Sequence, residues 1–174
     1  MESPDMMEPM LIAAGSRHRS ELTDLAVELA ASAAGLRRSL PEEISTALAG
    51  LVRVMNCYYS NLIEDHNTHP VDIERALKND CSSDPEKRNL QLEAKAHVEV
   101  QRWIDAGSLS GRAATREGVC EIHRRFCELL PKELRYAKDP DTGKRFGITP
   151  GELRDRDVRV GHHVAISPGA VQGS

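Results

Sequence analysis

Aromatic residues are scarce in this chain, and long apolar runs are missing. Of its 174 residues, 40% are hydrophobic but only 3% are aromatic. The core must therefore be built mainly from leucine, isoleucine, valine and alanine, and segments rich in alanine and leucine favour helix. The apolar runs fall well short of the roughly 20 residues that a membrane span needs. The first ten residues, MESPDMMEPM, lack the basic region that opens a signal peptide. We therefore expect no membrane partner.

Paired cysteines are also missing. The four cysteines show no CxxC spacing and no secretory context: Cys57, Cys81, Cys120 and Cys127. Such a pattern is typical of a protein that keeps its thiols reduced, so the expected location is the cytoplasm.

An excess of positive charge is lacking too, since the net charge is −4. This argues against bulk affinity for nucleic acid. The charge is uneven: residues 1–110 hold 11 basic and 18 acidic residues, net −7, and residues 111–174 hold 12 and 9, net +3. The C-terminal part is thus the side expected to meet an anion such as a nucleotide or an acidic protein surface. The alternative is that its arginines are simply solvated.

Apolar periodicity predicts two helices in the first part of the chain. A stripe of leucine and alanine predicts a helix over residues 20–34, with Gly35 at its end. Ser39-Leu40-Pro41-Glu42 has the pattern of a capping box with proline in the first turn, and it opens a helix that runs to Glu64. Eight apolar residues keep helical spacing along it: Ile44, Leu48, Leu51, Val52, Met55, Tyr59, Leu62 and Ile63.

Three further helices are predicted downstream. A short one follows Pro70 over residues 71–78. Asp84 and Pro85 have the pattern of an N-cap and first helical residue, and they open a helix that runs to about Asp105. Another is expected at about 114–130, where Pro131 follows. Its predicted buried stripe is Val119, Ile122, Phe126 and Leu129.

The last part of the chain predicts a small β element. KDPDTGKRFGITPG, residues 138–151, holds two prolines and three glycines and cannot be regular helix. Alternating valines and polar residues over 158–166 then predict a β-hairpin. The expected fold is all-α with one small hairpin. The expected parts are an N-terminal tail and helix (1–40), a helical region (41–110) and a part that carries the hairpin (111–174).

Ser60 and Glu64 lie four residues apart at the end of the second predicted helix, so they share one face. The helix macrodipole does not stabilise a carboxylate in the last turn, which is expected to need a cationic partner elsewhere. On spacing alone, an exposed helical pair is the simpler interpretation.

The stretch SNLIED, residues 60–65, resembles the inhibitory motif of Fic-domain proteins, which is Ser or Thr, three residues, Glu, then Gly or Asn. Ser60 and Glu64 match the motif, whereas Asp65 departs from it. In that family the glutamate pairs with an arginine of the catalytic loop and fills the place of the ATP γ-phosphate. A bidentate carboxylate–guanidinium pair is strong enough to compete in this way. The resemblance makes Glu64 the inhibitory carboxylate and Ser60 its helical partner.

A second resemblance extends over residues 122–171. IHRRF, GELR, DVRVG and a final Ser-Pro are similar to the segment that precedes the Fic catalytic motif. The hairpin there is called the flap, and it holds an extended stretch of the target protein. The resemblance assigns target docking to Asp157, Val158, Arg159, Val160 and Gly161. An exposed strand edge suits this role because it binds any backbone by β-augmentation. The alternative is a structural hairpin that covers a helix bundle.

The Fic catalytic signature, His-Pro-Phe, two residues and Gly-Asn-Gly-Arg, is absent. We therefore assign no catalytic residue and no metal ligand. The resemblance implies a Fic-like helical bundle. It makes the chain the N-terminal regulatory and target-docking portion of a protein AMP-transferase, truncated before that signature and inactive alone. Such an enzyme moves AMP from ATP, with Mg²⁺, to a Ser, Thr or Tyr hydroxyl of a protein substrate.

Two other interpretations stay open. The chain could be a non-catalytic inhibitor that acts in trans on another Fic domain. It could also be an unstable remnant in which helices 41–64 and 114–130 expose apolar faces, and it would then form homo-oligomers.

Cys120, His123 and Cys127 share a helix face and could contribute to a zinc site with a fourth ligand. The simpler interpretation is two small buried hydrophobic residues and a packed histidine.

Overall fold

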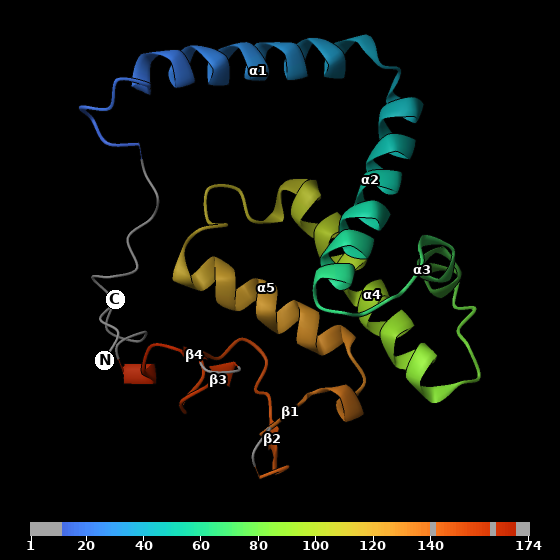
Figure 1. The fold of residues 1–174 in the computed structure, drawn as a ribbon. Coiled ribbons are helices and arrows are strands. Elements are labelled where there is room, and N and C mark those ends of the chain that lie inside the picture. Colours follow the sequence, from blue (N-terminus) through green and yellow to red (C-terminus); the bar gives the residue numbers. More distant parts are fainter. Residues whose placement is uncertain (1–11, 140–141, 161–162, 170–174) are drawn as a thin grey trace. The chain divides into compact units, whose positions relative to one another are not determined.

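The computed structural model describes residues 12–139, 142–160 and 163–169 (Figure 1). The described chain is mostly helical with short antiparallel hairpins, which confirms the expected class at that level. It divides into two units, one of Met1–Ala47 with Leu153–Ser174 and one of Leu48–Glu152. Each unit is described by itself below. The three-part division made from the sequence stays a prediction.

Five α-helices and two short antiparallel sheets are described. The helices are α1 (Arg19–Ser39), α2 (Glu42–Ile63), α3 (Pro70–Leu77), α4 (Pro85–Trp103) and α5 (Arg116–Leu129). A π-helical turn, η2 (Ile104–Ser108), follows α4, and a 3₁₀ turn, η3 (Lys132–Leu134), follows α5. The strands are β1 (Tyr136–Lys138), β2 (Arg145–Gly147), β3 (Arg159–Val160) and β4 (His163–Val164).

Helix α1 does not end at Gly35, so that prediction was wrong. The helix continues through Gly35 to Ser39. A single glycine costs a helix only about 1 kcal/mol, and the leucine and arginines that follow it favour helix. The true end is set by Pro41, because the residue before a proline avoids the helical region. Leu40 is accordingly extended, with φ −90° and ψ 131°.

Ser39 does not cap α2 as the sequence predicted. Its hydroxyl instead donates a 2.8 Å hydrogen bond to the Leu36 carbonyl in the last turn of α1. The first backbone bond of α2 runs from the Ser45 N–H to the Pro41 carbonyl, at 2.9 Å. The predicted cap at Asp84 is confirmed, since its carboxylate accepts from the Lys87 N–H at 3.0 Å.

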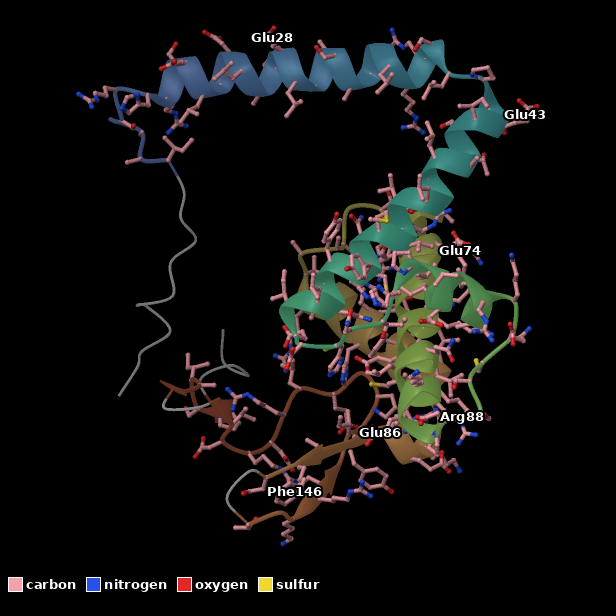
Figure 2. The ribbon with its side chains drawn as sticks, turned by 45° about the vertical axis from the view of Figure 1, so that its right-hand side comes forward. Glu28, Glu43, Glu74, Glu86, Arg88 and Phe146 are labelled. Carbon is pink, nitrogen blue, oxygen red and sulfur yellow. The ribbon has the colours of Figure 1, made fainter. Side chains whose placement is uncertain are left out.

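The core lies where α2, α3 and α4 meet, within the unit Leu48–Glu152. Its buried residues are Val54, Cys57, Ile73, Ala94 and Val98, with Tyr58 and Leu77 packed against them. Figure 2 shows the side chains crowding between these three helices. Gln91 is also buried, and its side chain ties both α3 and the α3–α4 connection to α4. It donates to the Asp72 carbonyl at 3.2 Å and accepts from the Ser82 N–H at 2.7 Å.

The apolar residues that mark α2 in the sequence are not its buried ones. The buried residues of α2 are Val54, Cys57 and Asn61. Most of the apolar residues picked out by spacing are exposed instead, among them Leu51 (53%), Val52 (53%) and Ile63 (83%). In α5, Gly118 and Cys127 are buried, whereas Val119 and Leu129 of the predicted buried stripe are about half exposed. Periodicity locates a helix, but burial depends on which face its neighbours cover.

The described residues form two hairpins where the sequence predicted one. β3 and β4 form the expected hairpin, with Arg159 opposite Val164 and Val160 opposite His163. β1 and β2 form another, with Ala137 opposite Phe146. In the connection between β1 and β2, the Asp139 carboxylate accepts from the Thr142 N–H at 2.8 Å.

Candidate regulatory site

The end of α2 has a defined C-cap geometry. The His66 N–H donates to the Asn61 carbonyl at 2.7 Å, and the Asp65 N–H donates to the Leu62 carbonyl at 3.2 Å. This pair of bonds is the Schellman motif, which places Glu64 at the C-cap and needs a left-handed residue directly after it. Asp65 takes that conformation, with φ 61°. Aspartate adopts it more readily than most residues because its short side chain bonds locally.

The side chains of Ser60 and Glu64 both face solvent. Within the described residues, the Glu64 carboxylate has no ion pair and no hydrogen bond, although its backbone N–H donates to the Ser60 carbonyl at 3.4 Å. The hydrogen-bonded pair that the spacing allows is therefore not formed. The carboxylate is left free to accept from a cation.

The loop that follows Glu64 is held by the core unit. His66 Nδ1 lies 3.6 Å from a carboxylate oxygen of Glu93 on α4. The His69 ring stacks on Tyr58 of α2, with 6.2 Å between ring centroids. Thr68 is only 3% exposed, and its N–H donates to the His66 carbonyl at 2.9 Å. The exposed carboxylate therefore stands on a fixed backbone, and this arrangement limits the entropy lost on binding a partner.

The predicted flap residues belong to the other unit. Asp157 and Val158 are exposed and lead into β3, which holds Arg159 and Val160. Gly161 lies outside the described residues. The Ala165 N–H donates to the Val158 carbonyl at 2.9 Å and extends the pairing of β3 with β4. Among the described strands neither β3 nor β4 has a further partner, so each has an outer edge with no other described strand beside it.

Sequence reasoning missed Arg154, which lies four residues before Val158, where the pairing of this hairpin begins. Its guanidinium donates to the Arg156 carbonyl at 2.9 Å and to the Ile166 carbonyl. No spacing rule identifies such an arginine, because both of its acceptors are backbone atoms. The GELR string marked its position only through the family resemblance.

Two of the three possible zinc residues on α5, His123 and Cys127, have structural contacts. Cys127 Sγ lies 3.3 Å from His123 Nε2, and His123 Nδ1 accepts from the Gly151 N–H at 3.0 Å. Burial raises the pKa of the Cys127 thiol, which disfavours the thiolate that a metal would need. Across the described part of the chain, no group of three or more potential ligands could hold a metal ion.

The comparisons with known proteins add no relatives, since no family model, curated protein or solved structure matches the chain. Among the helices that the structure describes, none has the length and apolar character needed to cross a membrane.

Proposed function

We propose that the chain is the regulatory and target-docking portion of a Fic-type protein AMP-transferase. In this account the Glu64 carboxylate is the inhibitory group, and Ser60 lies one turn before it on the same face. The Fic-like arrangement of the whole bundle belongs to the same proposal. The enzyme would transfer AMP from ATP to a protein hydroxyl, with the hairpin β3–β4 as the target-docking flap.

The observation that carries the proposal is the backbone at Asp65. The motif has Gly or Asn after its glutamate, and these are the residues that enter the left-handed region most readily. Asp65 has φ 61° there, so the departure in residue type leaves the expected helix end in place. The motif and the turn that it implies therefore occur together.

The chemistry follows from the exposed, unpaired Glu64 carboxylate. An arginine that must bind the γ-phosphate of ATP can instead form a bidentate pair with a carboxylate held at the same place. ATP would then be bound without its γ-phosphate in the productive position. Magnesium neutralises phosphate charge when ATP is bound, but the described residues offer it no ligand cluster. We therefore assign no step of this chain to the metal.

A second candidate function is inhibition in trans, and the outer face of α2 favours it. Leu48, Leu51 and Val52 are between 44% and 53% exposed on the helix that ends in Glu64. An apolar helix face of this kind suits docking along a groove of another protein. The same carboxylate would then act on a separate Fic domain.

One experiment separates the two candidates. A Fic catalytic domain that lacks its own inhibitory glutamate is assayed for automodification with labelled ATP, with this chain either fused to it or added free. Inhibition by the fused chain alone supports the regulatory portion, because fusion supplies a high effective concentration. Inhibition by the free chain as well supports trans-inhibition.

The control variants decide whether Glu64 is responsible. Glu64→Gln keeps the size of the side chain and removes its charge, so inhibition should be lost. Glu74→Gln removes the charge of another exposed glutamate, on α3, and should leave inhibition intact (Figure 2). Equal inhibition by the wild type and Glu64→Gln would contradict both candidates.

A further inference from the structure

The hairpin β3–β4 is short, and its two arms are joined by one side chain. Each strand has two residues, and one further backbone bond, from the Ala165 N–H to the Val158 carbonyl, extends the pairing. An isolated hairpin of this length is at best marginally stable in water. Something besides its own ladder must hold it closed.

Arg154 supplies that connection. One of its N–H groups donates to the carbonyl of Arg156, which precedes β3, at 2.9 Å. Another donates to the carbonyl of Ile166, which follows β4. The guanidinium therefore bridges the two arms at the base of the hairpin, and it is half-buried there.

The chemistry of the bridge requires arginine. The guanidinium is a planar fork with several fixed N–H donors, so it can bond two carbonyls on different segments at once. A lysine ammonium is a single compact charge on a flexible stem and is not pre-organised for both acceptors. Charge-assisted bonds of this kind are roughly twice as strong as neutral ones.

We propose that Arg154 is a positioning residue that keeps the base of the hairpin closed, so that an outer edge can accept an extended segment of a target protein. This inference rests on the proposed function. An edge strand recognises a peptide through regularly spaced main-chain groups, and fraying of the two strands would misalign them. Because the bridge acts on the backbone, its loss should weaken the docking of different target sequences alike.

The bridge itself is tested without any enzyme activity. Hydrogen exchange of the peptide that contains the Ala165 amide is measured in the full chain for the wild type, Arg154→Ala and Arg154→Lys. Exchange at Ala165 should accelerate by about tenfold or more in Arg154→Ala, because the loss of a bond to a charged group weakens closure by at least that factor. Arg154→Lys should restore only part of the protection. Arg88→Ala, at an exposed arginine of α4, is the control and should leave this amide unchanged. Unchanged exchange in Arg154→Ala would overturn the inference.

The docking role is tested next in the fusion of this chain with the Fic catalytic domain, which carries Glu64→Gln so that the inhibitory charge is absent. Arg154→Ala should raise the KM for a protein target, while kcat for transfer changes little. An unchanged KM alongside faster exchange would leave the bridge as a structural feature and overturn its role in positioning. No transfer by the Glu64→Gln fusion that keeps Arg154 would contradict the proposed function, whereas the exchange result would still report whether the bridge holds the hairpin.

Discussion

The two faces of α2 differ in what covers them. On the inner face, Val54 and Cys57 are 5% and 0% exposed and pack with residues of α3 and α4. On the outer face, Val52 and Leu51 are each 53% exposed. Both faces are apolar, so hydrophobicity alone does not distinguish them. The difference shows that the α3–α4 pair selects which apolar face of α2 is buried within the unit Leu48–Glu152.

The largest expected loss of stability comes from a substitution in the core that the inner face of α2 helps to form. Ile73 is fully buried, so Ile73→Ala should lower the free energy of unfolding by about 2–5 kcal/mol through lost burial and the cavity left behind. Val71→Ala, on the same short helix at 62% exposure, should cost less than about 0.5 kcal/mol. Denaturant unfolding of both variants measures the difference. Equal losses would place Ile73 outside the core.

A matched pair of valines tests the two faces of α2 directly. Val54→Ala should cost about 2 kcal/mol, because it removes two buried carbon groups worth roughly 0.8 kcal/mol each and leaves a small cavity. Val52→Ala, two residues earlier, removes the same atoms from a half-exposed site and should cost a small fraction of that amount. Thermal unfolding of the two variants gives the comparison. A larger loss at Val52 would mean that the outer face is covered in solution.

A substitution at the end of α2 is expected to raise stability, in contrast to the core variants. Asp65→Gly should stabilise the chain by about 0.5 kcal/mol, because glycine enters the left-handed region without the cost that an L-residue meets there. Asp65→Ala should lower stability instead, since alanine lacks a side chain that bonds locally. Unfolding midpoints of both variants provide the measurement. A stabilised alanine variant would show that the residue at 65 does not keep a positive φ.

The smallest expected effect is on the pH dependence of stability, and it comes from an ion pair at the end of α3, one of the two helices that cover the inner face of α2. The Arg75 guanidinium donates to Asp80 at 2.8 Å, and this bond and the arginine's charge lower the pKa of that carboxyl. A lowered folded-state pKa contributes stability that is present above the unfolded value of about 3.9 and is lost as the pH falls through the folded value. The contribution is small because the pair is exposed.

Asp80→Asn should therefore reduce stability slightly at neutral pH and flatten its decline below about pH 4. Unfolding midpoints measured between neutral and acidic pH test this. A wild type and variant that lose stability in parallel at low pH would show that the ion pair contributes nothing.

Local signals predicted much of the fold. The Asp84 cap and Pro85 located the start of α4, and Pro70 located α3, because caps and prolines act within one turn of helix. The face of α2 that is buried could not be predicted, since it depends on helices distant in sequence. The hairpin β1–β2 was not predicted, because its strands are three residues long and mostly exposed. Such strands lack the alternation of apolar and polar residues that marks a half-buried strand.

The sequence predicted only the part of the candidate site that depends on local features. The spacing of Ser60 and Glu64 is a local feature, and the family resemblance gave it a role. The left-handed backbone of Asp65 follows from helix-end geometry and could be anticipated only from its place after the motif. The bridge made by Arg154 joins carbonyls on either side of a hairpin, and side-chain patterns carry no information about such acceptors.

The most direct test of the central claim is whether inhibition by this chain competes with ATP. Automodification by a Fic domain that lacks its own inhibitory glutamate is measured with the fused or added chain over a range of ATP concentrations. If Glu64 occupies the place of the γ-phosphate, inhibition should weaken as ATP rises, and Glu64→Gln should abolish it. Inhibition that is independent of ATP, or unchanged in Glu64→Gln, would contradict the account.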